Sequence, residues 1–458
     1  MRSGWAFLAF LAFLILAPPA LLADQAADQA ADQAARRGPL ELSLKRAVEL
    51  ATSAEGNTRV QLSAEALKQA QARSAQARAA LLPDLAGTAT EQSLTRNLAA
   101  MGITVVTPFP GFHFPTFVGP FSNMDARVTA SQSVFDFSSI RRFQASKVGV
   151  SAATADVSGA GEQVAAQVAR SYLAVARADA DVDTARANVT LSGAVLKQAE
   201  DQKAAGTGTG IEITRAKVQL ANDRQHLLVA LNQRRSAELQ LLRAMGLRLD
   251  TELTLTDRLQ YVPVDAVTIE QAKALAFKQR PDYQAQQERE STARLSASAT
   301  RLERVPSVAA FGDYGSSGTG FDNALPTRTY GIAVRVPIFD GGRRDARRAE
   351  SASQWRAERV RTNDLKEQIE LDVRLALDAL HSAEEQVKVA AEGLELAGNE
   401  LAQAQRRYEG GVAAGLEVTD AQTRLARARD NQTAALYGYN VARIDLAQAM
   451  GAVRRMVE

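Results

Sequence analysis

Two long proline-free stretches of the chain place small and large residues alternately at heptad a and d positions. In the later stretch, steps of three and four residues connect Val373, Ala376, Leu380, Ala383, Val387, Ala390, Leu394, Ala397, Leu401, Ala404 and Tyr408. This spacing predicts a coiled coil, and a small residue at every second position lets two helix backbones approach closely. No proline interrupts residues 342–410. At 1.5 Å per residue, such a helix would be on the order of 100 Å long.

The same pattern occurs in two other parts of the chain. After a glycine-rich turn it returns at Val418, Ala421, Leu425, Ala428, Gln432, Ala435, Tyr439, Ala442, Leu446 and Ala449. Some 205 residues before the first set it occurs at Val168, Ser171, Val175, Ala178, Val182, Ala185, Val189, Ser192, Leu196 and Ala199. We therefore expect two tight antiparallel helical hairpins, with tips near 203–214 and 408–418.

A different pattern, with a period of two, predicts strands. Within 328–339, apolar residues from Tyr330 to Ile338 alternate with small or polar ones. A second alternation covers 123–137, and pairing strands with weaker patterns are expected near 83–97 and 306–317. Alternation over about ten residues suits a membrane-spanning strand with one face toward lipid. A soluble hairpin with one wet face would alternate equally well.

The chain contains an internal duplication. Gly210, Glu212 and Thr214 align with Gly415, Glu417 and Thr419. We place the first repeat at 41–246, a linker at 247–267 and the second repeat at 268–458. Each repeat has the order helix, strand, strand, long helix, glycine turn, helix. The first also has an extra aromatic-rich and proline-rich segment at 98–122. It could be an extracellular loop that touches a lipid interface or folds over the mouth of a pore, and a packed structural loop is the alternative.

The N-terminal segment predicts export. A single cation, Arg2, precedes an apolar run of 12 residues and two consecutive prolines. This pattern predicts a signal peptide at residues 1–23, and a low-complexity tail follows at 24–40. A membrane anchor is the alternative. No later run reaches about 18 apolar residues, so a mature chain that crosses a membrane must do so as a β-barrel. Four strands cannot close a barrel. Two chains would supply eight strands and three would supply twelve.

Composition excludes most chemistry. The 458 residues include no cysteine and only 3 histidines, and 54 basic side chains nearly balance 52 acidic ones. We therefore expect no catalytic, cofactor-binding or metal-binding residues and no nucleic-acid partner. The glycines at 206–210 lack the rest of a dinucleotide motif. A periplasmic coiled-coil adaptor or scaffold is the alternative function, although an adaptor would normally carry one hairpin between β-domains.

Two segments resemble a known family. Residues 336–344, Val-Pro-Ile-Phe-Asp-Gly-Gly-Arg-Arg, are similar to the strand-to-helix junction of the TolC-type outer-membrane efflux proteins, and 406–422 resemble their periplasmic hairpin tip. The resemblance covers nearly the whole mature chain. It implies a mixed fold, mostly α, in which a homotrimer joins a twelve-stranded outer-membrane barrel to a periplasmic α-helical barrel. It also implies a passive conduit in efflux or type I secretion, with outer-membrane lipid, a periplasmic adaptor and an inner-membrane pump as partners.

The resemblance suggests three groups of functional residues. Tip residues expected to meet an adaptor are Gly206, Gly210, Ile211, Ile213, Gly411, Gly415, Leu416 and Val418; simple hairpin turns are the alternative. Tyr408 matches a tyrosine that helps to close the tip in the family, but Ala413 stands where the family has its partner arginine. Candidate gate residues are therefore Asp201, Arg406, Arg407 and Tyr408, although Tyr408 could simply pack in the heptad seam. The strand–helix junctions comprise Phe135, Asp136, Phe339, Asp340, Gly341 and Gly342.

Arginines follow both predicted strand ends, where cations are unfavourable at a helix N-terminus. They are Arg141, Arg142, Arg343, Arg344, Arg347 and Arg348. If the strands cross a membrane, lipid phosphates could compensate these charges. An ordinary solvated face is the alternative.

Overall fold

The computed structural model describes residues 40–457 apart from 54, 104–110, 112–114, 207, 266, 411 and 413–414. The predicted signal peptide, nearly all of the tail and part of segment 98–122 lie outside the described residues. The chain divides into two compact units. One unit comprises the residues up to Ala51, Gln167–Val262 and Gln386–Asn440, and the other comprises Thr52–Ala166, Pro263–Glu385 and Val441–Glu458.

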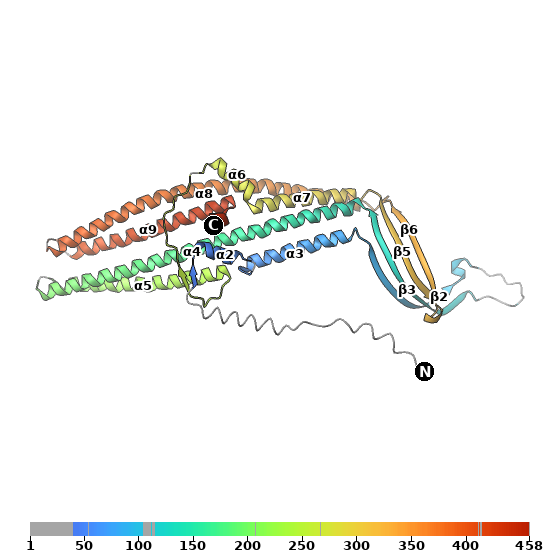
Figure 1. Ribbon diagram of the computed structural model, residues 1–458, viewed down its shortest axis with the longest axis horizontal. Coiled ribbons are helices and arrows are strands. Elements are labelled where there is room, and N and C mark those ends of the chain that lie inside the picture. Colours follow the sequence, from blue (N-terminus) through green and yellow to red (C-terminus); the bar gives the residue numbers. More distant parts are fainter. Residues whose placement is uncertain are drawn as a thin grey trace, which may run out of the picture. The chain divides into compact units, whose positions relative to one another are not determined.

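The second of these units contains an antiparallel four-stranded sheet (Figure 1). Its strands are β2 (Asp84–Asn97), β3 (Phe117–Phe135), β5 (Ser307–Gly318) and β6 (Leu325–Arg335), and their order in the sheet is β2-β3-β5-β6. Central pairs such as Ala89 with Ala126 and Gly312 with Tyr330 fix the register. Strands β2 and β6 form the two edges of the sheet. Side chains on β6 are largely exposed, including Tyr330 at 83% and Ile332 at 74%.

Two strand limits differ from the predicted ones. Strand β3 begins at Phe117 rather than near 123, and β6 ends at Arg335 although the alternation continues to Ile338. The last β5–β6 pair is Ser307 with Arg335. Beyond it, Pro306 on one side and Pro337 on the other lack a backbone N–H, so the hydrogen-bond ladder cannot continue.

Short 3₁₀ turns lie next to the outer ends of the strands, and helices lead to and from the sheet. The turns are η1 (Ala99–Met101) and η2 (Phe321–Asn323). Helix α3 (Thr58–Ala79) precedes β2, α4 (Phe137–Ala204) follows β3, α7 (Pro281–Leu302) precedes β5, and α8 (Arg343–Glu409) follows β6. Helices α4 and α8 contain 68 and 67 residues. Each is therefore about 100 Å long, which is the length predicted for the helix within 342–410.

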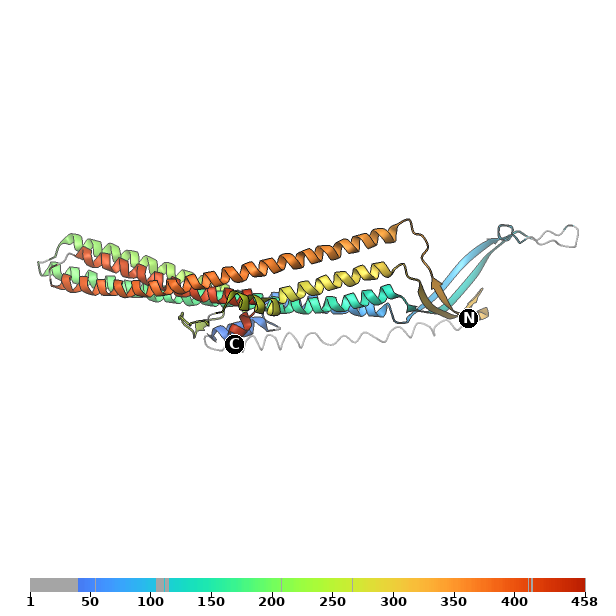
Figure 2. The same cartoon turned by 90° about the horizontal axis from the view of Figure 1, so that it is seen from above.

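Each long helix turns back into a 36-residue helix. Helix α4 is followed by α5 (Gly210–Met245) and α8 by α9 (Gly415–Met450). Figures 1 and 2 both show α4 beside α5 and α8 beside α9 near these turns. Of the predicted a and d positions in α8, eight are buried: Val373, Ala376, Ala383, Val387, Ala397, Leu401, Ala404 and Tyr408. The heptad prediction is confirmed for this helix.

The packing shows that α8 and α9 are antiparallel. In one unit, Leu401 and Tyr408 near the end of α8 pack with Val418 near the start of α9. In the other unit, Val373 of α8 packs with Leu446 near the end of α9. Small residues such as Ala404 and Ala421 lie between the large ones. They allow the close approach that the alternating seam predicted.

The remaining elements are short. Helices α2 (Leu44–Thr52), α6 (Ile269–Gln279) and α10 (Val453–Val457) belong to this set, and β1 (Leu40–Leu42) pairs in parallel with β4 (Leu253–Leu255). Strand β4 lies within the segment predicted as a linker. The buried hydroxyl of Tyr172 on α4 donates to the carbonyl oxygen of Leu42 at 2.9 Å and contacts Oδ2 of Asp257 at 3.1 Å. These bonds attach both short strands to α4.

Candidate functional site

The turn between α4 and α5 is built from backbone hydrogen bonds. Gly206 has a φ of +76°, the left-handed conformation that commonly follows a helix, and its N–H donates to the carbonyl oxygen of Lys203 at 3.1 Å. The N–H of Gly208 donates to the carbonyl oxygen of Gln202 at 3.0 Å. At the start of α5, Oε2 of Glu212 accepts from the N–H of Thr209 at 3.0 Å. Helix α5 then begins at Gly210, and the side chain of Ile211 is 58% exposed.

The turn between α8 and α9 uses similar bonds. The N–H of Gly410 donates to the carbonyl oxygen of Arg406 at 3.1 Å, and that of Val412 donates to the carbonyl oxygen of Arg407 at 2.9 Å. Gly411 and Ala413 lie outside the described residues. Leu416, one residue into α9, is 53% exposed.

Two of the expected tip residues are less exposed than a docking surface requires. Val418 is only 1% exposed, because it occupies a seam position of α9 and packs against α8. This corrects its assignment to the docking surface. Ile213 is half-buried, whereas its neighbour Ile211 points to solvent. The exposed apolar groups of the tips are Ile211, Val412 and Leu416.

Tyr408 connects the two hairpins. Its ring is 5% exposed and packs with Val418 and Ala421, while its hydroxyl donates to Oε1 of Gln202 on α4. Burial raises the pKa of Tyr408, and the charge of Glu212 adds to this rise, so the hydroxyl keeps its proton at neutral pH. Tyr408 is therefore both a seam residue and a polar link between hairpins.

The other gate candidates have different surroundings. Nε of Arg407 lies 3.4 Å from Oε1 of Glu417, which ties α8 to the start of α9. Nε of Arg406 donates to the carbonyl oxygen of Ala402 in its own helix at 3.2 Å. The side chain of Asp201 is exposed. The structure thus brings Tyr408 to Gln202 and Arg407 to Glu417, and it joins neither pair to Asp201 or Arg406.

Sequence reasoning missed Gln202, Glu212 and Glu417. Glu212 had a signal: in Thr-x-x-Glu at 209–212 the carboxylate stands three residues after the helix cap, where it can accept from the cap N–H. Glu417 had no such pattern, because Ala414 stands three residues before it. Gln202 had no such signal. It aligns with Arg407 in the duplication and not with Tyr408, and only packing between the hairpins brings it to the tyrosine.

The two strand–helix junctions differ in length. In the first, β3 ends at Phe135 and α4 begins at Phe137, so Asp136 alone separates them. Oδ1 of Asp136 accepts from the N–H groups of Ser138 at 2.9 Å and Ser139 at 3.3 Å. This carboxylate caps α4 and satisfies N–H groups that have no partner within the helix.

In the second junction, seven residues separate β6 from α8. Oδ2 of Asp340 accepts from the N–H of Arg344 at 3.2 Å. Gly341 and Gly342 have φ values of +68° and +85°, which other residues adopt only with strain. Phe339, just before Asp340, is exposed. Both aspartates thus have the same capping role despite the different spacing.

Carboxylates neutralise several arginines that follow the strands. Nη2 of Arg347 lies 2.7 Å from Oε2 of Glu303, and Oε1 of the same carboxylate contacts Arg142. Nη1 of Arg344 lies 3.4 Å from Oδ2 of Asp340.

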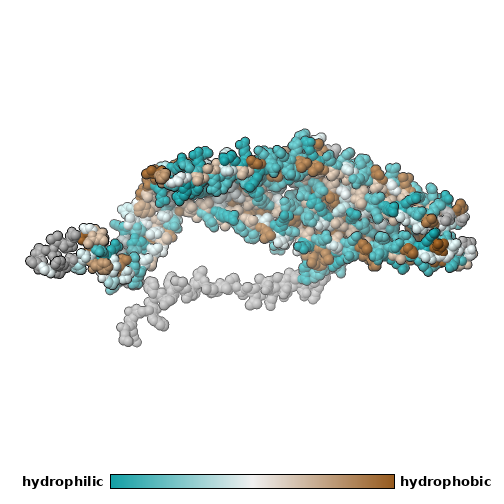
Figure 3. All heavy atoms as spheres, turned by 180° about the vertical axis from the view of Figure 1, so that it is seen from behind, coloured by the Kyte–Doolittle hydropathy of each residue, from teal (hydrophilic) through white to brown (hydrophobic). Residues whose placement is uncertain are grey.

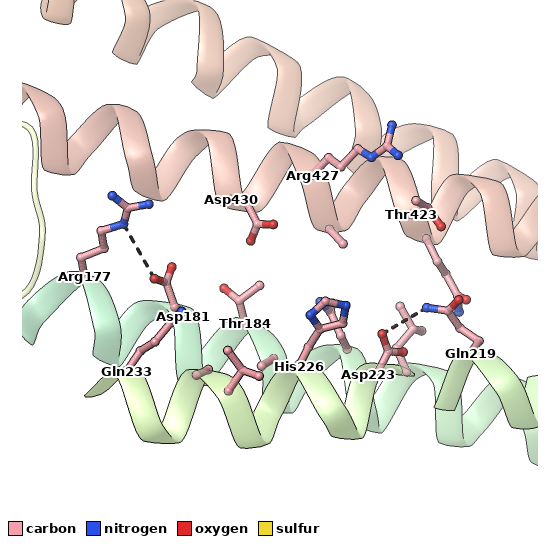
Figure 4. Close-up of a pocket in the computed structure, with 17 residues that line it drawn as sticks. Arg177, Asp181, Thr184, Gln219, Asp223, His226, Gln233, Thr423, Arg427 and Asp430 are labelled. Carbon is pink, nitrogen blue, oxygen red and sulfur yellow. Dashed lines mark hydrogen bonds and ion pairs between the residues drawn. The ribbon is translucent and has the colours of Figure 1, made fainter. Parts of the chain in front are cut away.

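A polar cavity of about 470 Å³ lies between α4, α5 and α9 in the unit that contains the tips (Figure 4). Nε of Arg177 lies 3.8 Å from Oδ2 of Asp181, and Nε2 of Gln219 donates to Oδ1 of Asp223 at 3.1 Å. Burial raises the pKa of Asp181 against the opposing effect of Arg177. Burial also raises the pKa of Asp430, opposed by His226 and Arg177.

The described residues contain no cluster of three or more histidine, cysteine or acidic side chains arranged to hold a metal ion. Within the same described part of the chain, every helix is either too short or too polar to span a bilayer.

The sequence matches the family described as outer membrane efflux protein over residues 51–247 and 274–452. The chain belongs to this family and is therefore a protein of the outer membrane. The mostly helical fold with a smaller sheet agrees with this class.

Individual relatives are distant. A pyoverdine export outer membrane protein of Pseudomonas putida is 25% identical over 290 residues, which cover 62% of this chain and 61% of that protein, less than two thirds of its length. The outer membrane channel CmeC of Campylobacter jejuni has 17% identity and a TM-score of 0.77, covering 89% of this chain and 85% of that one. The outer membrane protein VceC of Vibrio cholerae has 18% identity and a TM-score of 0.75, with 89% and 96% covered. These structures share the fold.

Proposed function

We propose that the protein is the outer-membrane channel of a tripartite efflux or type I secretion system. It provides a passive conduit, and a separate inner-membrane pump supplies the energy. The observation that carries this proposal is the pairing, in one chain, of an exposed open-edged sheet with two helices of 68 and 67 residues. A periplasmic adaptor would need only one helical hairpin, whereas this chain has two.

The sheet supports assembly into a homotrimer. Strands β2 and β6 each have one neighbour, so their outer edges carry unpaired backbone groups. Three chains would close a twelve-stranded barrel, in which the exposed apolar side chains of β6 could face lipid. The strand–helix junctions at Asp136 and Asp340 would then stand at the periplasmic boundary of the membrane.

The hairpin tips would meet the adaptor. Ile211 and Leu416 present apolar side chains beside Gly210 and Gly415, the first residues of α5 and α9. Opening would require the hairpins to move apart as rigid coiled coils. The bond between Tyr408 and Gln202 would have to break, so these residues form the polar link that closes the tip, and the ion pair of Arg407 with Glu417 stiffens one hairpin.

A charged substitution at Gly206 tests the docking role. A Cβ at Gly206 would meet no atom within 4 Å, so Gly206→Asp costs only the strain of its left-handed backbone, about 1 kcal/mol. We expect normal trimers in the outer membrane and loss of export. Gly398→Asp is the matched control, because Gly398 is also in open space but lies within α8. Normal export from Gly206→Asp would contradict docking at this tip.

Fractionation tests the wider proposal. We expect the protein in the outer membrane as a trimer that only detergent releases. A soluble periplasmic monomer would eliminate the channel and leave the adaptor. Because the chain contains no cysteine, single cysteines at Ile211 or Leu416 can then be cross-linked to identify the adaptor and hence the transported class.

A further inference from the structure

Two adjoining cavities lie between α7 and α8. Their volumes are about 450 and 350 Å³, and Trp355 and Arg359 line both. The smaller one lies next to the sheet-proximal end of α7, where Arg301 stands six residues before the start of β5. Figure 3 shows a mostly hydrophilic surface along the helices near the sheet, with a hydrophobic patch at the junction itself. These cavities are remote in sequence from both hairpin tips.

The cavity walls are strongly cationic. The smaller cavity is lined by Arg301, Arg348, Arg356 and Arg359 without any acidic side chain, and the larger adds Arg294, Lys366 and a single acid, Glu290. Like charges gathered around a cavity repel each other unless an anion neutralises them. All four arginines of the smaller cavity are exposed, so water screens part of this repulsion, and a bound anion would neutralise the charges that remain.

The protein's own carboxylates do not supply it. Among the described residues, no ion pair involves any of the four arginines of the smaller cavity, whereas neighbouring arginines are paired. Arg304 contacts Asp345, Arg361 contacts Glu358, and Nη2 of Arg289 lies 2.6 Å from Oδ1 of Asp156. These three acids therefore pair with arginines outside the smaller cavity, and no carboxylate lines that cavity.

Trp355 provides a second, independent observation. Its indole Nε1 is buried and has no hydrogen-bond acceptor among the described residues. An unsatisfied buried donor costs roughly 1–3 kcal/mol. An oxyanion in the cavities would supply acceptors to the arginines and, after a small shift, to this indole.

We propose that the α7–α8 cavities form a binding site for the phosphate groups of an anionic ligand. Guanidinium groups match phosphate oxygens in charge and in paired geometry. Arg348 and Arg359 are eleven residues apart, which is about 16 Å along a helix, so the site accommodates a ligand with more than one phosphate. Soluble diphosphates and the headgroups of diphosphorylated lipids share this chemistry. A lipid is the natural source of the phosphates only if the sheet lies in the membrane, as proposed above. The phosphate site itself does not depend on that proposal.

Trp355 also supplies the measurement. The chain has two tryptophans, and Trp5 lies in the predicted signal peptide, so Trp355 is the only tryptophan of the predicted mature chain. The full-length detergent-solubilised protein is titrated with inorganic pyrophosphate and, separately, with mixed micelles that contain cardiolipin. We expect a saturable change in Trp355 emission that weakens as salt rises. Replacing both Arg301 and Arg359 by Gln should weaken binding by about tenfold or more, which corresponds to about 1.4 kcal/mol.

Arg361→Gln is the matched control, because it removes a cation two residues from Arg359 that already contacts Glu358. It should leave the affinity unchanged. If the double variant fails to assemble, two single variants give the same comparison. Arg356→Gln should bind the probe more weakly, and Arg301→Lys, which preserves the charge, should still bind it. A response to pyrophosphate identifies a soluble phosphate site, and a response to cardiolipin alone identifies a headgroup site. No response to either probe, or equal loss in Arg361→Gln, would overturn the proposal. None of these readouts requires transport.

Discussion

At the scale of single residues, Tyr408 combines two roles that its position in the sequence suggested only as alternatives. The ring fills a seam position, and the hydroxyl crosses to Gln202 on α4. The ring thus packs within the hairpin, and the hydroxyl makes the contact that we propose closes the two hairpins. Substitutions that separate ring and hydroxyl can therefore separate stability from closure.

Tyr408→Phe should cost about 1 kcal/mol of the free energy of unfolding, because it removes one hydrogen bond and keeps the ring. Tyr408→Ala should cost about 3–5 kcal/mol, because it also leaves a cavity. Denaturant unfolding of the detergent-solubilised protein measures both. Tyr437→Phe is a control, since the ring of Tyr437 lies 5.1 Å from the Arg177 guanidinium and its hydroxyl has no partner in the described part of the chain. If Tyr408→Phe and Tyr408→Ala lowered the free energy of unfolding equally, the hydroxyl alone would stabilise the protein and the packing of the ring would contribute nothing.

Asp136 allows a similar separation of charge from capping geometry. Asp136→Ala should cost about 1 kcal/mol, because the N–H groups of Ser138 and Ser139 lose their acceptor. Asp136→Asn should be close to neutral, since asparagine caps about as well. Amide hydrogen exchange at Ser138 and Ser139 reports the effect locally. If the Asn variant exchanges as fast as the Ala variant, the charge and not the cap holds the junction.

At the scale of elements, the sequence predicted what local periodicity controls. The heptad seam gave both the length of α8 and its buried face, because each buried position follows from the one before it. The end of β6 was predicted too far along the chain, because the alternation continues through Val336 and Ile338 after the ladder has ended. That end depends on Pro337 of the predicted strand and on Pro306, which precedes β5, and neither proline interrupts the alternation of apolar and polar positions in 328–339. The burial of Val418 was deducible from the seam, and the contact of Tyr408 with Gln202 was not.

The polar cavity between α4, α5 and α9 predicts a pH dependence of stability. Burial raises the pKa values of Asp181 and Asp430 in the folded protein, so the folded state binds more protons than the unfolded state in this range. Their contribution to stability is present below the unfolded-state pKa, near 4, and is lost as pH rises through the folded-state values.

Asp430→Asn should therefore raise the midpoint of thermal unfolding at pH 7 and flatten its dependence on pH between 4 and 7. Asp181→Asn should have a weaker effect, because it also removes the partner of Arg177. Asp183→Asn serves as a control, since that side chain is 76% exposed. A lower unfolding midpoint at pH 7 for Asp430→Asn would mean that His226 and Arg177 outweigh the cost of burial.

At the scale of the whole molecule, the two segments proposed as repeats have the same order of elements and differ at their strand–helix junctions and hairpin tips. The first repeat joins strand to helix through Asp136 alone, and the second uses a seven-residue junction with two left-handed glycines. The first tip carries Lys203 where the second carries Tyr408. Duplication thus supplies two similar hairpins, and divergence supplies the polar contact between them.

The strand order makes a specific prediction about assembly. All neighbouring strands are antiparallel, so β6 runs opposite to β2 and could pair with β2 of another copy without breaking the alternation. Single cysteines on β2, around Ala89, and on β6, around Thr329, should then form disulfides between chains. The positions that react must follow an antiparallel diagonal: moving the β6 cysteine two residues forward requires moving the β2 cysteine two residues back. Cysteines on β3 and β5 should not link different chains, because these strands already have two neighbours. The largest product counts the chains in the ring, and three is expected. A parallel diagonal, or links through β3, would contradict closure through the β2 and β6 edges.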